Sequence, residues 1–99
     1  MLHTINKSPF MSNSLNECLR VAKDGSAILL IEDGVYAALK GSKFADVMSN
    51  AMGKHEVYAL GPDLDARGLS GKVIDGIKVV DYGGFVDLAA EQPRVQAWL

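Results

Sequence analysis

A single cysteine, Cys18, is the residue of this chain best suited to covalent chemistry. The preceding residues Ser14-Leu15-Asn16-Glu17 have the pattern of a capping box. In that motif the Ser14 hydroxyl accepts from the backbone N–H of position 17, and the Glu17 carboxylate accepts from the N–H of Ser14. The pattern predicts a helix start, with Cys18 about one turn inside the helix. Unpaired N–H groups and the positive end of the helix dipole favour a thiolate there.

Three roles are open to this thiol, because one cysteine cannot form an internal disulfide. It is a buried apolar filler, the partner of a cysteine in another molecule, or a reactive group. Apolar residues recur at helical spacing and define the stripe that faces the core: Leu15, Cys18, Leu19 and Ala22. Burial raises the pKa of a thiol, so this stripe favours the filler. A reactive role would require the start of the helix to open onto a cleft.

The other polar residues form no known catalytic or metal-binding motif. The sequence has no CxxC, HExxH or Cys/His cluster and no glycine-rich phosphate motif, so we expect no metal and no cofactor. Asp33-Gly34 is interpreted as a turn. Asp63, Asp65 and Arg67 are expected on a solvated helix face.

Two histidines and an apolar chain end are further candidates. His3 is expected on a strand, either half-buried with a hydrogen-bond partner or as a base near the first loop. His55 precedes a strand and is expected at the surface. Trp98-Leu99 would be costly to leave in water, so this end packs on its own domain or meets a partner.

Length, charge and hydropathy limit the class of protein. The 99 residues fit one domain, and the 48% hydrophobic content suffices for a core. The net charge of −2 gives no basic field for direct nucleic-acid binding. No signal peptide is visible in residues 1–7, and the apolar run of residues 27–31 is too short to span a membrane. We therefore expect a soluble, cytoplasmic protein.

Short strands and helices alternate along the chain. Strands are expected at residues 2–5, 27–31, 56–60 and 77–80, and helices or helical turns at 15–24, 35–39, 44–51, 64–67 and 85–91. The aliphatic run 27–31 is expected as a central strand covered on both faces. The alternation predicts a single domain over residues 1–99, folded as a three-layer α/β/α sandwich with a mostly parallel sheet of about four to five strands.

Functional sites in such folds gather in the loops beyond the carboxyl ends of the strands. Four segments are expected at this edge: residues 6–13, 32–34, 61–63 and 81–84. The first of them leads into the helix of Cys18, which places the thiol about one turn from the predicted site.

Five segments together resemble the DsrH/TusB family of sulfur-relay subunits: residues 2–10, 32–38, 58–69, 80–88 and 96–99. The resemblance runs through nearly the whole chain in order. It implies a small α/β subunit that assembles with DsrE/TusD-like and DsrF/TusC-like subunits into a dimer of heterotrimers. A DsrC/TusE-like protein would accept sulfur from this complex.

The family has two branches, one passing persulfide sulfur toward 2-thiouridine at the tRNA wobble position and one acting in sulfur oxidation. The resemblance implies that the main persulfide cysteine belongs to the DsrE/TusD-like partner. Cys18 matches a further cysteine of DsrH-type members, which typical TusB-type members lack, so it is a possible persulfide carrier and the Dsr branch is preferred. A TusB-like relay subunit and a non-catalytic structural subunit remain alternatives. A free-standing module for a small anionic ligand is disfavoured by the resemblance.

Overall fold

The computed structural model describes residues 1–99, in which strands and helices alternate as the sequence predicts. The elements are, in chain order, β1 (Leu2–Ile5), α1 (Ser14–Val21), β2 (Ala27–Leu30), the 3-10 helix η1 (Glu32–Ala38), α2 (Ala45–Met52), β3 (Glu56–Leu60), α3 (Gly61–Ala66), β4 (Lys78–Val80), α4 (Tyr82–Glu91) and β5 (Val95–Trp98). None of the helices combines the length and apolar character that a membrane crossing requires.

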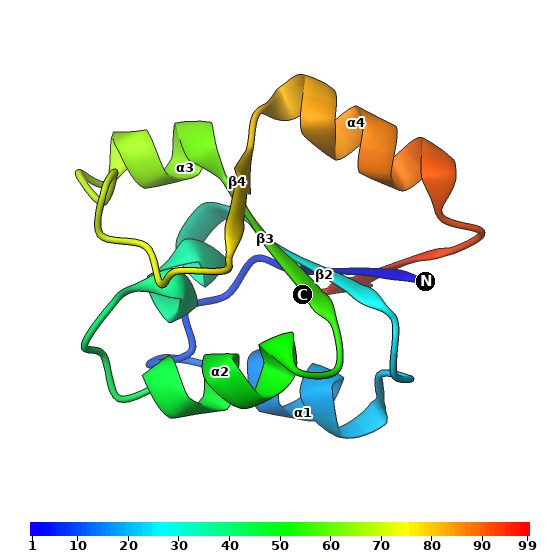
Figure 1. Ribbon diagram of the computed structural model, residues 1–99, viewed down its shortest axis with the longest axis horizontal. Coiled ribbons are helices and arrows are strands. Elements are labelled where there is room, and N and C mark those ends of the chain that lie inside the picture. Colours follow the sequence, from blue (N-terminus) through cyan, green and yellow to red (C-terminus); the bar gives the residue numbers. More distant parts are fainter.

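The five strands form one parallel sheet in the order β4-β3-β2-β1-β5. The aliphatic strand β2 lies at its centre, as predicted, and all four of its residues are buried. Helices α1 and α2 cover one face of the sheet and α4 lies on the other (Figure 1). The predicted α/β class with helices on both faces is therefore confirmed.

The two faces of the sheet carry cores of different size. Sixteen buried residues form the larger core, which includes Ile28 and Leu30 of β2 together with Cys18 of α1 and Met48 of α2. Only five buried residues form the core beneath α4: Leu2, Ala27, Leu29, Tyr58 and Leu88. Alternate residues of β2 thus point to opposite cores, as the two-residue period of a strand requires.

The start of α1 does not have the predicted capping box. Asn13 occupies the N-cap position without a side-chain capping bond, and the N–H of Ser14 donates to the Ser12 hydroxyl at 3.2 Å. Glu17 instead accepts from the side-chain amide of Asn13 at 3.2 Å. The helix also ends at Val21, three residues earlier than expected, because the chain turns extended at the next residue.

Helices α3 and α4 begin earlier than the sequence indicated. Asp81 caps α4 by accepting from the backbone N–H of Gly84 at 2.8 Å, so Gly83-Gly84 form its first turn rather than a loop. In α3, Pro62 occupies the first turn, where its missing N–H costs no intrahelical bond.

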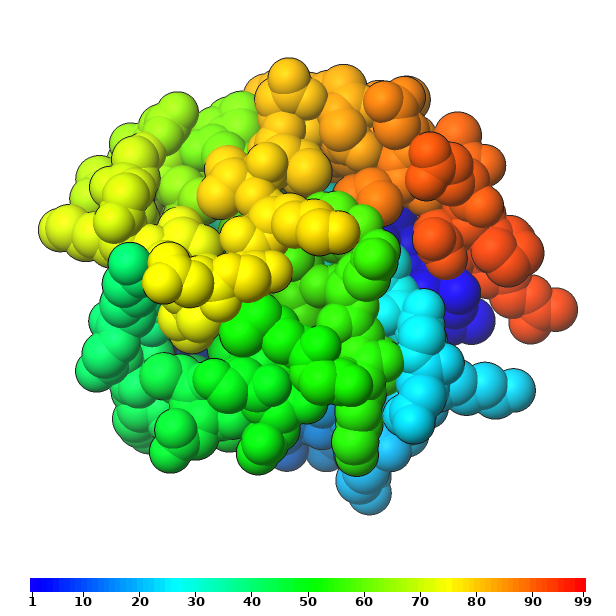
Figure 2. Space-filling model, in the orientation of Figure 1, coloured from blue at the N-terminus to red at the C-terminus, as the bar shows by residue number.

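Strand β5 is the one element that we did not predict. It pairs in parallel with β1, with Gln96 opposite His3 and Trp98 opposite Ile5. The apolar end of the chain therefore packs on its own sheet, although Leu99 remains 84% exposed. In the space-filling view the dark-blue N-terminal residues lie between the cyan segment that leads into β2 and the red C-terminal segment (Figure 2).

Candidate functional site

Cys18 lies in the larger core, and none of its side chain is exposed. Burial raises the pKa of the Cys18 thiol to about 12, so the group is protonated at neutral pH. The favourable position near the helix start is therefore outweighed by desolvation. In this conformation the thiol has the surroundings of a filler, and persulfide carriage at Cys18 stays a prediction.

The carboxyl edge of the sheet, where we expected the site, is closed by a network of charged groups. Arg67 donates from Nε and Nη2 to one carboxylate oxygen of Asp33, at 3.0 and 2.8 Å, and from Nη1 to the carbonyl of Asp63 at 3.1 Å. The Asp63 carboxylate accepts from the backbone N–H of Glu32 at 2.6 Å, where the backbone has a φ of +50°. Asp63 and Arg67 thus join η1 to α3 and do not form the simple solvated helix face that we expected, whereas Asp65 is exposed as expected.

Gly34 closes the same edge by packing rather than by charge. A Cβ atom at this position would lie 2.1 Å from the carbonyl oxygen of Ile5, a distance at which atoms overlap. The turn therefore requires glycine because the start of η1 crosses directly over the end of β1. Neither of the two cavities in the molecule lies at this edge.

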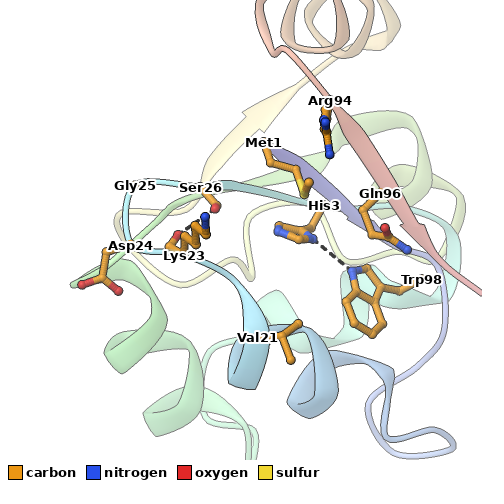
Figure 3. A pocket seen from close by; sticks show the side chains of 10 residues that line it. All are labelled: Met1, His3, Val21, Lys23, Asp24, Gly25, Ser26, Arg94, Gln96 and Trp98. Atoms are coloured by element: carbon orange, nitrogen blue, oxygen red, sulfur yellow. Dashed lines mark hydrogen bonds between the residues drawn. The ribbon is translucent and has the colours of Figure 1, made fainter.

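The largest cavity lies at the opposite, amino edge, beside β1 and β5, and has a volume of about 730 Å³. Ten residues line it (Figure 3): Met1, His3, Val21, Lys23, Asp24, Gly25, Ser26, Arg94, Gln96 and Trp98. The indole Nε1–H of Trp98 donates to Nδ1 of His3 at 3.1 Å, and His3 is only 4% exposed. Burial is the main reason that the pKa of His3 is lowered below its ordinary value of 6.5.

His3 is thus a buried histidine with a partner, one of the two roles that we considered. The other role, a base near the first loop, was wrong because that loop follows Ile5 at the far end of β1. His55 is not at the surface as expected: it is 7% exposed, and its Nδ1 has no hydrogen-bond partner. It lines a second cavity of about 230 Å³ beside α1 and α2.

Comparison with known proteins identifies the family. The family model described as "DsrH like protein" matches residues 7–95. The chain belongs to the DsrH/TusB family. Protein TusB of Enterobacter sp. (strain 638) is 44% identical over 98 residues, covering 99% of this chain and 100% of that protein. Protein TusB of Escherichia coli (strain K12) is 41% identical with the same coverage.

Solved structures support the same fold at lower identity. The ychN protein from E. coli has a TM-score of 0.83, with 20% identity and 97% of each chain covered. A protein of unknown function from Methanobacterium thermoautotrophicum has a TM-score of 0.72, with 19% identity and 97% of this chain covered. At this identity the similarity concerns the fold of the DsrH/TusB chain and not its activity.

Sequence reasoning missed the pairing of His3 with Trp98, although it singled out each residue. The two are 95 positions apart and meet only because β5 adds to the edge of β1. The sequence held one signal: Gln96 and Trp98 alternate with the apolar residues Val95 and Ala97, which is the pattern of a short strand.

Proposed function

We propose that this chain is a TusB-like subunit of a cytoplasmic sulfur relay that passes persulfide sulfur toward 2-thiouridine at the wobble position of tRNA. The observation that carries the proposal is its 41–44% identity to TusB proteins over their whole length. These relatives favour the tRNA-thiolation branch over the sulfur-oxidation branch that Cys18 led us to prefer.

Within this relay we assign the chain a structural role. Its only thiol is buried and protonated, so it offers no accessible nucleophile for sulfur. The catalytic persulfide would then belong to a DsrE/TusD-like partner, and a DsrC/TusE-like protein would accept the sulfur.

Exposed apolar side chains support assembly with DsrE/TusD-like and DsrF/TusC-like subunits into a heterohexamer. Val79 of β4 is 55% exposed, and Tyr82 and Val86 of α4 are 60% and 66% exposed. Phe10 and Met11, in the loop before α1, are 50% and 87% exposed. Large apolar groups gathered on one element are typical of protein interfaces. We therefore expect α4 to contact a partner subunit.

Complementation tests the relay assignment. The chain would be expressed in an E. coli strain that lacks TusB, and 2-thiouridine in tRNA would be quantified by nucleoside mass spectrometry. We expect the modified nucleoside to return. Empty vector is the negative control and the E. coli protein the positive control. An unmodified tRNA pool, despite a folded chain that binds the host partners, would favour the sulfur-oxidation branch.

A matched pair of variants tests the structural role. Cys18→Ala should restore thiolation as well as the unchanged chain does, because the thiol only fills space. Tyr82→Glu with Val86→Glu should abolish binding to the partners and thiolation while leaving the subunit folded, since both side chains are exposed. Loss of thiolation in a folded, assembled Cys18→Ala complex, with gain of one sulfur by the unchanged chain, would establish Cys18 as a carrier instead.

A further inference from the structure

The cavity at the amino edge has no part in the proposed relay, although it is the larger of the two cavities in the molecule. Its volume of about 730 Å³ lies within the range of roughly 300–1,000 Å³ that is typical of small-molecule sites. Arg94 lies on one side of the cavity and Val21 and Trp98 on the other, with His3 between them (Figure 3).

His3 presents a hydrogen-bond donor to this cavity. Its Nδ1 accepts from the Trp98 indole, so the neutral ring must carry its proton on Nε2. That second nitrogen has no protein partner, and in Figure 3 it lies on the side of Lys23 and Ser26. Only 4% of His3 is exposed, and its Nε2–H is free to donate to an acceptor that enters the cavity.

The charged side chains around the cavity favour an anion. Arg94 and Lys23 line it, and neither makes an ion pair within the chain. Asp24 is the one acidic lining residue, and its carboxylate points away from His3 and Arg94 (Figure 3). Two side-chain cations without an ion pair and a neutral donor thus line the same space, while the one acidic side chain faces outward.

The rest of the lining is mixed, because it includes the polar Ser26 and Gln96 as well as apolar side chains. Met1, Val21 and Trp98 supply the hydrophobic part of the lining. A few converging polar groups set against apolar walls are the usual composition of a ligand site. We propose that this cavity binds a small organic carboxylate. The carboxylate accepts from His3 Nε2–H and pairs with Arg94 and Lys23, and the apolar body of the ligand packs on Trp98 and Val21.

Benzoate is a suitable probe because it joins a carboxylate to a flat apolar body. Trp98 is the only tryptophan, so one indole N–H resonance of the ¹⁵N-labelled full chain reports on the cavity. We expect benzoate to shift this resonance saturably. Acetate lacks the apolar body and benzamide lacks the charge, so both should bind more weakly than benzoate.

Charge-neutralising variants locate the site. Arg94→Gln and Lys23→Gln should each weaken benzoate binding roughly fivefold, which corresponds to the loss of about 1 kcal/mol for one exposed ion pair. Arg20→Gln and Lys72→Gln remove the same charges away from the cavity and should leave the affinity unchanged. Absence of a saturable shift, equal binding of benzamide, or equal affinities among all four variants would overturn the proposal.

Discussion

The two edges of the sheet are built in opposite ways. At the carboxyl edge, Arg67, Asp33 and Asp63 join η1 to α3, and Gly34 packs directly on the carbonyl of Ile5. At the amino edge a cavity of about 730 Å³ stays open beside His3 and Trp98. In most open parallel sheets the carboxyl edge is the one that binds ligands.

This contrast indicates which edge of the sheet has room for a ligand and which does not. The edge that usually holds a site is filled by contacts within the chain, and the only thiol lies inside the core. The open cavity lies at the amino edge, which is not the usual place for a ligand site in an open parallel sheet. The rule that open parallel sheets bind ligands at the carboxyl edge therefore applies only when the loops there leave a cleft. In this chain η1 and α3 fill that space.

Gly34→Ala should disrupt the packing at the carboxyl edge and cause the largest loss of stability. The added Cβ would overlap the carbonyl of Ile5, so η1 or β1 must shift, at a cost of about 3 kcal/mol or more in the free energy of unfolding. Urea unfolding followed by circular dichroism measures the change. Gly83→Ala is the matched control: its Cβ would meet only a carboxylate oxygen of Asp81 at 3.4 Å, so stability should stay within about 1 kcal/mol. Equal stability of the two variants would contradict the described packing.

Asp63→Ala should loosen the same edge by a smaller amount. It removes the acceptor for the N–H of Glu32, whose positive φ is held by this bond, and takes a negative charge from beside Arg67. We expect a loss of about 1–2 kcal/mol in the free energy of unfolding. Asp87→Ala removes an exposed, unpaired carboxylate from α4 and should change stability by less than about 0.5 kcal/mol. A similar loss in both variants would mean that the network contributes nothing specific.

The sequence predicts most of the fold because local patterns suffice for it. Strands β1 and β3 occur at the predicted residues, since each is a short apolar run bounded by turn-forming residues. The central position of β2 follows from its unbroken aliphatic composition. The start of α4 was missed because Gly83-Gly84 suggest a loop, and only the Asp81 cap makes them helical.

The candidate site could be predicted only in part, because it depends on contacts between distant residues. An edge strand such as β5 has mostly exposed side chains, so it lacks the apolar run that marks β2. Without β5, nothing in the sequence brings Trp98 to His3. The closure of the carboxyl edge also depends on the contact of Arg67 with Asp33, 34 positions away, which composition and spacing do not reveal.

At the amino edge, His3→Gln should have the smallest effect of these substitutions. It should change only how the free energy of unfolding depends on pH. Burial lowers the pKa of His3 in the folded chain, so the unfolded chain binds this proton more readily. The stability that this pKa difference contributes is fully present above pH 6.5, the ordinary pKa of histidine. It is lost as the pH falls toward the lowered pKa of the folded state. Glutamine can still accept from the Trp98 indole but does not titrate, so the variant should lose less stability than the unchanged chain between pH 7 and 5.

Urea unfolding at several pH values measures the difference, and the Trp98 indole resonance should move with pH only when His3 is present. Parallel stability profiles would show that the proton on His3 is not linked to folding.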